Sequence, residues 1–451
     1  MSLKIIIVGA GEVGFHIARR LAAENKEVVV IDRSPQALKR IVEYADVQVV
    51  EGPGSCPSTL RAAGIHETDI LLAVTDSDET NFIACTIANA LNPNITKLSR
   101  IRNEEYIEFH ENILNIGKVI NPEEEVIKTI LQFMDVPGAV DISQFAGGRI
   151  KLIGVRVGDG PLVGRKLMYI RQAVGGFGLL VAAIIRGEQL TIPSGGDEIR
   201  PGDLVYFVCD DEHVYEAMAL FGRRSHQVKN VLVVGGGNIG LRLARELEGT
   251  ALRVRLLDRD ADRCQYLAQE LDRTVVLEGD GTDQDLLLEE NVGGMDMVVS
   301  LTGHEETNVL ISMLAKSMGA KSVITRINKF AYLPLVRTIG IEHTVSPRLS
   351  AVNSILRYMR RGKVLTTASI RGEEAEAMEA VAQENSEVVG KSLKDLKLPK
   401  GALVLSIQRG EDVIFPTGDA VILPQDRFII LSTRKTIEKV EKALTVKLEH
   451  F

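Results

Sequence analysis

A glycine-rich pattern suited to binding phosphate groups occurs twice in this 451-residue chain. The copies span residues 5–14 and 231–240, and each runs from apolar residues into Gly-x-Gly-x-x-Gly. In such loops the first glycine allows a tight turn, the second lets a pyrophosphate approach the backbone, and the third allows close helix packing. The helix that follows offers free N–H groups to the phosphates. The expected nucleotide-binding residues of the two loops are Gly9, Ala10, Gly11, Glu12, Val13 and Gly14, and Gly235, Gly237, Asn238, Ile239 and Gly240.

An aspartate follows each glycine pattern at the distance where a carboxylate can hold a ribose hydroxyl. Asp32 ends the apolar run 28–31, and Asp258 ends the equivalent run of the second copy. One glycine pattern alone is a weak signal, because Rossmann-like domains that bind nothing also carry it, but two copies with two aspartates form a strong one. A carboxylate repels a 2′-phosphate, which favours NAD over NADP. The arginines that follow, Arg33 and Arg259, weaken this argument because arginine can bind that phosphate.

Further polar residues fall at the carboxyl ends of predicted strands, the edge of a doubly wound sheet where ligands bind. Thr75 and Thr302 end the fourth strand of each copy, and Arg100 and Arg326 end the fifth. Each threonine can contact ribose or phosphate, or it can cap the following helix. Each arginine can bind a phosphate through two hydrogen bonds, or it can form a structural ion pair. The sequence leaves these alternatives open.

Neither a catalytic site nor a metal site is expected. A dehydrogenase needs a proton donor or base beside the nicotinamide, but the eight histidines are scattered and none falls in a repeated motif. The metal-binding patterns His-x-His, Cys-x-x-Cys and His-Glu-x-x-His do not occur in the sequence. Five acidic residues after the fourth strands can bind a cation or can interact with the dipole of the following helix, and we favour the second interpretation. They are Asp76, Asp78, Glu79, Glu305 and Glu306.

The elements that must position these residues also repeat. Strand-type and helix-type segments alternate through both glycine-loop regions, which predicts two parallel, doubly wound sheets with right-handed crossovers. A smaller lobe follows each, and in the first of these we expect a strand at 151–157, a helix at 161–173 and a closing helix at 211–221. The predicted fold is therefore α/β, with two Rossmann-like sheets, each followed by a small α+β lobe, in the order A-B-A′-B′. The expected domains are Rossmann-like lobes at 1–122 and 229–347, crossover helices at 123–140 and 348–366, and small β-rich lobes at 141–224 and 367–451.

Each expected crossover helix begins near a proline, Pro122 or Pro347, a residue favoured in the first helical turn. The segment 122–134 carries apolar residues over a broad face. Such a helix can close its own lobe, or its face can pack against another subunit. The second alternative predicts that the protein self-associates.

Composition limits the function. The formal net charge is −8, which argues against nucleic acid binding through bulk positive charge. The longest apolar stretch, residues 179–185, is too short to span a bilayer, and Lys4 is followed directly by a strand rather than a secretory signal. Any role at a membrane therefore requires a partner. The four cysteines have no paired spacing, which indicates free thiols in a reducing cytoplasm.

The combination of motifs resembles the family of tandem regulator-of-potassium-conductance (RCK) proteins, which includes the regulatory subunits of Trk-type potassium uptake. The resemblance covers nearly the whole chain. It rests on the glycine loops, the two aspartates, the Thr-x-x-x-Glu-x-Asn segments, the loop 278–282, the Pro-Gly-Asp and Pro-Gln-Asp turns, and the A-B-A′-B′ order.

This resemblance implies a nucleotide sensor that binds NAD(H) and/or ATP/ADP and gates a membrane potassium-translocating subunit of Trk type. It also implies a cytoplasmic homo-oligomeric ring that associates with the inner face of the membrane through that partner. Two other functions stay open. One is an NAD-dependent oxidoreductase that uses the small lobes as substrate domains, although duplicated lobes without catalytic residues count against it. The other is a stand-alone nucleotide sensor with no channel partner.

The first copy departs from the family pattern in the loop after its third strand. The second copy has Glu-Gly-Asp-Gly-Thr at 278–282, whereas the first has Glu-Gly-Pro-Gly-Ser at 51–55. In the family this loop lies beside the adenine, which implies further nucleotide contacts at Gly52, Gly279 and Asp280. Proline offers neither a carboxylate nor an N–H group at the position of Asp280. The first site is therefore expected to hold the base less tightly than the second.

Overall fold

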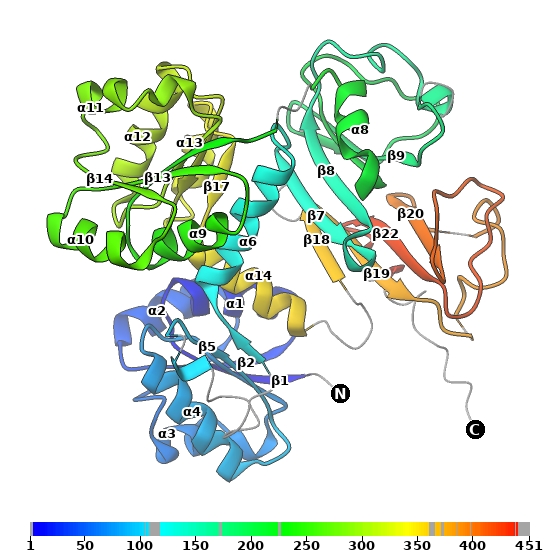
Figure 1. Ribbon diagram of the computed structural model, residues 1–451. Helices are drawn as coiled ribbons and strands as arrows, with labels where there is room; N and C mark the ends of the chain where they lie inside the picture. Colours follow the sequence, from blue (N-terminus) through cyan, green and yellow to red (C-terminus); the bar gives the residue numbers. More distant parts are fainter. Residues whose placement is uncertain are drawn as a thin grey trace, which may run out of the picture. The chain divides into compact units, whose positions relative to one another are not determined.

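The computed structural model describes residues 3–103, 105–107, 118–170, 174–223, 227–359, 366–370, 374–384, 386–396, 398–437 and 439–440. The chain divides into two compact units, one of residues 1–130 and 229–358 and the other of residues 131–228 and 359–451. The first unit contains both Rossmann-like lobes, and the second contains both small lobes (Figure 1). Within the described ranges, no helix is long and apolar enough to cross a membrane.

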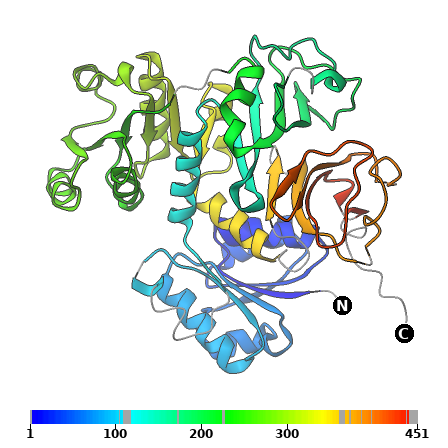
Figure 2. The ribbon, with the colours of Figure 1, turned by 45° about the vertical axis from the view of Figure 1, so that its right-hand side comes forward.

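The first lobe is built on a six-stranded parallel sheet with the strand order β3-β2-β1-β4-β5-β6. Figure 2 shows this sheet with α1 on one face and α4 on the other. The order reverses between β1 and β4, and ligands of such sheets bind where the order reverses. The strands are β1 (Lys4–Val8), β2 (Glu27–Asp32), β3 (Gln48–Glu51), β4 (Ile70–Ala73), β5 (Thr96–Arg100) and β6 (Lys118–Ile120). The helices are α1 (Glu12–Ala23), α2 (Pro35–Tyr44), α3 (Pro57–Ala62) and α4 (Asp78–Leu91).

The second lobe repeats this order as β14-β13-β12-β15-β16-β17. Its central strand is buried on both faces, as parallel strands covered by helices are, because the adjacent residues Val231 and Leu232, which point to opposite faces, are both 0% exposed. The predicted pair of doubly wound sheets is confirmed. In the first lobe, most of a helix that we also expected, at 104–110, lies outside the described residues. The strands are β12 (Asn230–Val234), β13 (Arg253–Asp258), β14 (Val275–Glu278), β15 (Met297–Ser300), β16 (Ser322–Arg326) and β17 (His343–Val345). The helices are α9 (Asn238–Glu248), α10 (Ala261–Glu270), α11 (Gln284–Glu289), α12 (Glu305–Ser317) and α13 (Tyr332–Thr338).

A crossover helix follows each Rossmann-like sheet and begins at the expected proline. These helices are α6 (Pro122–Asp135) and α14 (Pro347–Met359). Ile130 of α6 and Ile355 of α14 are 0% exposed. The two helices also contact each other, because the hydroxyl of Ser354 donates a hydrogen bond to the Glu125 carboxylate at 2.8 Å. The broad apolar face of α6 is therefore largely filled within one chain.

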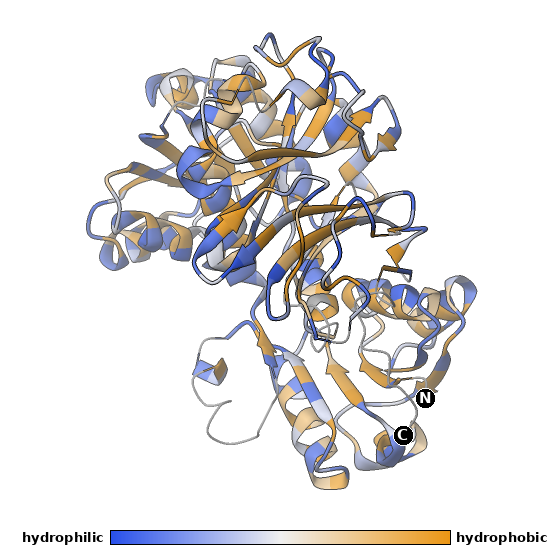
Figure 3. Ribbon diagram, turned by 90° about the vertical axis from the view of Figure 1, so that its right-hand side faces the viewer, coloured by the Kyte–Doolittle hydropathy of each residue, from blue (hydrophilic) through white to orange (hydrophobic). Residues whose placement is uncertain are grey.

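The second unit consists of two five-stranded antiparallel sheets, ordered β10-β9-β11-β8-β7 and β18-β19-β22-β20-β21. They share one hydrophobic core, to which Leu152 and Tyr206 contribute from the first sheet and Ala377 and Leu431 from the second. Figure 3 shows the hydrophobic residues concentrated on the strands. The strands are β7 (Asp141–Phe145), β8 (Ile150–Arg156), β9 (Leu179–Arg186), β10 (Gln189–Thr191), β11 (Leu204–Asp210), β18 (Thr366–Ile370), β19 (Ala375–Val381), β20 (Ala402–Arg409), β21 (Asp412–Ile414) and β22 (Arg427–Thr433).

The helix expected at 161–173 is wrong within the described residues. This segment is mostly irregular and contains only one short 3₁₀ turn, Leu167–Tyr169. Val163 forms an isolated β-bridge with Ile199. Gly164 has a φ of +73°, which an interior helical residue does not adopt. The closing helix is present as α8 (Val214–Leu220), so the predicted α+β character of the small lobe is confirmed.

Candidate functional site

The first and third glycines of each loop are required by the backbone of the loop itself. The φ angle is +111° at Gly9 and +107° at Gly235, a region that glycine adopts without strain. A Cβ atom on Gly14 would lie 1.8 Å from the carbonyl oxygen of Gly9, and one on Gly240 would lie 2.0 Å from that of Gly235. The third glycine therefore lets the first helical turn close against the tight turn.

The second glycine of each loop faces open space. Gly11 and Gly237 are the N-cap residues of α1 and α9, and no side chain caps either helix. A Cβ atom on either glycine would meet no heavy atom within 4 Å. The N–H groups at these helix termini can therefore be reached by a phosphate group, which the helix dipole would attract.

The two predicted aspartates connect the glycine loops to the second strands through hydrogen bonds. One carboxylate oxygen of Asp32 accepts a hydrogen bond from the N–H of Ala10 at 2.6 Å, and the other accepts from Ser34 at 2.8 Å. Asp258 accepts in the same way from Gly236 at 2.6 Å and from Asp260 at 3.0 Å. A carboxylate oxygen has a second lone pair, so each aspartate can still accept from a ribose hydroxyl.

The threonines at the fourth strands belong to a repeated hydrogen-bond network. The hydroxyl and the N–H of Thr75 both donate to the Asn81 side-chain oxygen, at 2.7 and 2.9 Å. The Asn81 amide group donates in turn to the carbonyl of Arg100 at 2.8 Å. Thr302 and Asn308 repeat the arrangement in the second lobe. The asparagines thus join two strand ends to a helix, and the signal for this role in the sequence is the repeated Thr-x-x-x-Glu-x-Asn motif.

Thr75 is not the N-cap of the helix that follows it. That position is held by Ser77, whose hydroxyl accepts from the N–H of Thr80 at 3.1 Å. In the second lobe the N-cap residue of α12 is His304, which makes no side-chain capping bond. The capping alternative for the two threonines is therefore wrong. Contact between these threonines and a ribose or phosphate stays a prediction.

The arginines at the fifth strands lie at the same sheet edge but have different partners. Arg100 donates to the Asp76 carboxylate at 2.9 Å. Burial acts to raise the pKa of Asp76, but the hydrogen bond and charge of Arg100 lower it on balance. Arg326 has Gly303 where the first lobe has Asp76, and it donates only weakly to the carbonyl of Leu301, at 3.3 Å. The Nε atoms of both arginines are buried without a hydrogen-bond partner in the described structure.

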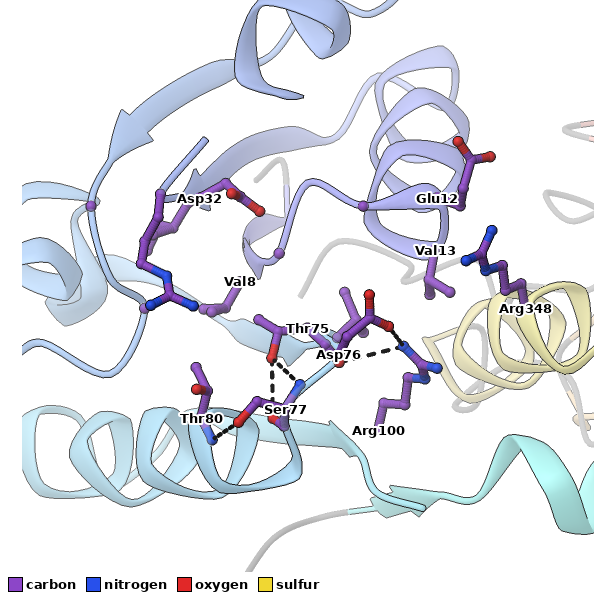
Figure 4. A pocket seen from close by; sticks show the side chains of 17 residues that line it. Val8, Glu12, Val13, Asp32, Thr75, Asp76, Ser77, Thr80, Arg100 and Arg348 are labelled. Carbon is purple, nitrogen blue, oxygen red and sulfur yellow. Dashed lines mark hydrogen bonds and ion pairs between the residues drawn. The ribbon is translucent and has the colours of Figure 1, made fainter. Parts of the chain in front are cut away.

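A cavity of about 420 Å³ lies over the first glycine loop (Figure 4). Of the sequence-predicted residues of this site, Ala10 and Gly14 do not line it. The lining also includes Arg348 from the start of α14, which the sequence did not indicate because it lies in the other half of the chain. The predicted residues that do line the cavity are Gly9, Gly11, Glu12, Val13, Asp32, Gly52, Thr75 and Arg100.

The loops after the third strands have the same backbone turn but different side chains. Gly52 and Gly279 have φ angles of +153° and +159°. Asp280 is exposed, and one of its carboxylate oxygens accepts from the N–H and the hydroxyl of Thr282 at 2.8 and 2.7 Å. These hydrogen bonds lower the pKa of Asp280. Its charged carboxylate is thus held in a fixed orientation, whereas Pro53 has no such group.

The acidic groups near the loops interact with backbone N–H groups. Among the described residues, no group of three or more His, Cys, Asp or Glu side chains is placed to hold a metal ion. The acidic residues at the start of α4 and α12 have other contacts. Asp78 accepts from the N–H groups of Arg102 and Asn103 at 2.9 Å, and Glu305 accepts from those of Asn328 and Lys329 at the same distance.

Comparison with known proteins identifies both kinds of lobe. The TrkA-N domain model matches residues 5–122 and 231–347, and the TrkA-C domain model matches residues 152–222 and 377–445. The Trk system potassium uptake protein TrkA of Halomonas elongata is 37% identical, with 100% of each chain covered. The protein of the same name from Vibrio alginolyticus is 36% identical, over 97% of this chain and 98% of the relative.

Solved structures of the same fold include two of GsuK. The GsuK RCK domain matches with a TM-score of 0.60 at 16% identity, over 98% of this chain and 95% of the other. The GsuK channel bound to NAD matches with a TM-score of 0.61 at 16% identity, over 98% of this chain and 79% of the other. These likenesses confirm the predicted order of two Rossmann-like sheets, each followed by a small lobe.

Proposed function

Since this chain belongs to the TrkA family, we propose that it is the nucleotide-binding regulatory subunit that gates a Trk-type potassium-translocating membrane protein. It acts in the cytoplasm and reaches the inner face of the membrane through that partner. The observation that carries the proposal is the duplicated glycine loop, whose second glycine faces open space in both copies and, in the first copy, lines a cavity with Asp32 and Arg100.

The proposed ligands are NAD(H) and/or ATP/ADP. The cavity of about 420 Å³ has the size of small-molecule sites, and GsuK, a channel with the same fold, has been solved with NAD bound. The phosphates would bind the N–H groups after Gly11 and Gly237, and the ribose would bind Asp32 and Asp258. The remaining proposed contacts are the loop residues Gly9, Ala10, Glu12, Val13, Gly14, Gly235, Asn238, Ile239 and Gly240, together with Gly52, Thr75, Arg100, Gly279, Asp280, Thr302 and Arg326.

Thermal unfolding with NAD, NADH, ATP, ADP and NADP tests ligand binding. A ligand at 100 times its Kd stabilises the native state by about 2.7 kcal/mol. We expect a shift with at least one of these ligands and none for the double variant Gly11→Val/Gly237→Val. Ligand binding without retention on membranes that contain a Trk-type subunit, at low salt, would instead favour a stand-alone nucleotide sensor.

An Asp258→Ala variant is expected to bind NAD at least tenfold more weakly, because the loss of a charged hydrogen bond costs roughly 1.5–3 kcal/mol. The second site is measured alone in a Gly11→Val background, by titration calorimetry. The same change also removes the acceptor of the Gly236 N–H, so binding must be measured well below the unfolding temperature. NADP should bind more weakly than NAD, since the carboxylate repels its 2′-phosphate. Equal affinities for the two would contradict the assigned role of the carboxylate.

An oxidoreductase is disfavoured by the lining of the first cavity. In the described part of the chain, this lining contains no histidine, tyrosine, lysine or cysteine. A nicotinamide enzyme commonly uses such a side chain as proton donor or base. The carboxylates of this lining, Glu12, Asp32 and Asp76, accept hydrogen bonds from Arg40, Ala10 and Arg100. Turnover of NADH with a small carbonyl compound would reverse this conclusion.

The proposed ring of copies needs a surface other than the buried face of α6. Large apolar side chains are exposed on α12, at Leu310 and Met313, and at the end of α13, at Leu335 and the C-cap residue Ile339, with exposed fractions between 41% and 62%. Light scattering should therefore give a mass above the 49.3 kDa of one chain at micromolar concentration. A clean monomer would contradict the ring, and Leu335→Lys should lower the mass without unfolding the lobe.

A further inference from the structure

Among the described residues, Arg348 is the one residue of the second half of the chain that lines the first cavity. It lies near the start of α14, after the second Rossmann-like sheet, yet its side chain lines the first cavity (Figure 4). Among the described residues, its guanidinium forms no hydrogen bond and no ion pair. Its positive charge acts on the nearby carboxylates of Glu12 and Asp76. Within the described part of the chain, the cavity thus contains a guanidinium group whose donors are not used by another residue.

The position of Arg348 matches one end of a bound nucleotide. Asp32 and Arg348 lie on opposite sides of the glycine loop (Figure 4). A nucleotide whose ribose binds Asp32 and whose first phosphates lie over Gly11 would direct its remaining phosphate towards Arg348. Arginine suits this role, because its planar fork binds phosphate oxygens through two hydrogen bonds.

The equivalent residue of the other half carries the opposite charge. Glu123 follows Pro122 as Arg348 follows Pro347. The Glu123 carboxylate lies 4.0 Å from the Arg242 guanidinium and lines a cavity with Asn238, the counterpart of Glu12 in the second glycine loop. Burial raises the pKa of Glu123, while Arg242 and Arg326 act to lower it. The start of α6 thus brings a carboxylate to a cavity that also contains the guanidinium groups of Arg102, Arg242 and Arg245.

We propose that Arg348 is a specificity residue of the first site, which binds the terminal phosphate of a nucleoside di- or triphosphate across the boundary between the two Rossmann-like lobes. The proposal rests on the proposed nucleotide-binding function and assigns a ligand class to one of its two sites. The matching position of the second Rossmann-like lobe's site carries Glu123 in place of an arginine, so no equivalent phosphate contact is assigned there.

The test compares ATP with AMP at the first site alone. Titration calorimetry is carried out on the full chain in a Gly237→Val background, with Arg348 and with Arg348→Ala. Loss of a charge-assisted hydrogen bond is expected to weaken ATP binding roughly ten- to a hundredfold. AMP affinity should change little, because AMP does not reach Arg348. Arg348→Lys should retain part of the ATP affinity, since lysine keeps the charge but lacks the fork.

Arg337→Ala, at an exposed arginine of α13, is the matched control and should leave both affinities unchanged. Thermal unfolding without nucleotide checks that each variant is folded. If Arg348→Ala is not folded, the ATP and AMP affinities of Arg348→Lys are compared with those of the unchanged chain. An unchanged ATP to AMP affinity ratio overturns the role of Arg348. Binding at the second site but none at the first overturns it as well and leaves nucleotide sensing intact. Absence of binding in both single-site variants overturns the proposed function itself.

Discussion

An Ile130→Asp chain is expected to lose most of the stability of its first compact unit. Ile130 is 0% exposed and is the last residue of α6 that belongs to this unit. Removing a buried isoleucine side chain costs about 2–5 kcal/mol, and burying a carboxylate without a partner costs several kcal/mol more. The sum is comparable with the roughly 5–15 kcal/mol that stabilises a typical domain. Urea unfolding followed by circular dichroism should show a much lower midpoint or no cooperative transition.

Lys128→Ala provides the control on the same helix. Lys128 is 58% exposed and pairs with Glu124 one turn earlier, at 2.5 Å. Such a surface pair contributes at most about 1 kcal/mol, so the unfolding midpoint should move little. If Ile130→Asp kept the midpoint and instead dissociated an oligomer, the α6 face would be an intermolecular surface, the alternative that the sequence left open.

The loops and sheets could be predicted because their signals are local. The turn at Gly9 and the aspartate at the end of β2 are fixed by residue types at short spacings, and the same spacings recur in the second half. The helix expected at 161–173 failed because apolar spacing alone did not reveal that Gly164 takes a positive φ. Bridges to residues more than 30 positions away, such as Val163 to Ile199, then replace helical hydrogen bonds.

Contacts between the two halves could not be predicted from spacing. Arg348 is separated by more than 300 residues from the loop whose cavity it lines, and no periodic pattern encodes that approach. The shared core of the two small lobes is a similar case. The apolar character of β9 predicts burial, but not that its partners include Leu405 and Leu431 from the second half.

The two nucleotide sites are expected to differ most in their preference for adenine. Asp280 presents a charged carboxylate held by Thr282, and this group can accept from an adenine amino group. Pro53, at the matching position, cannot. The difference amounts to one charge-assisted hydrogen bond, worth about 1.5–3 kcal/mol in a desolvated site. Phosphate and ribose binding should survive at the first site, because Gly11 and Asp32 are in place.

Valine substitutions at the second glycines isolate the sites with little effect on the fold. Gly11 and Gly237 have φ near −64° with an extended ψ, which valine tolerates, and their Cβ atoms would enter open space. The new side chain would occupy the position of the pyrophosphate. The Gly237→Val variant then reports on the first site, and the Gly11→Val variant reports on the second.

The decisive quantity is the ratio of ATP to GTP affinity at each site, because the two ligands share their phosphates and any contact with Arg348 cancels. This ratio should be roughly ten- to a hundredfold smaller at the first site. Pro53→Asp should raise it there, and Asp280→Ala should lower it at the second. Equal ratios at the two sites would mean that Pro53 carries no penalty. Ser55, half-buried in the same loop, would then be the residue to test as a replacement contact, since Ser55→Ala should remove the preference at the first site alone.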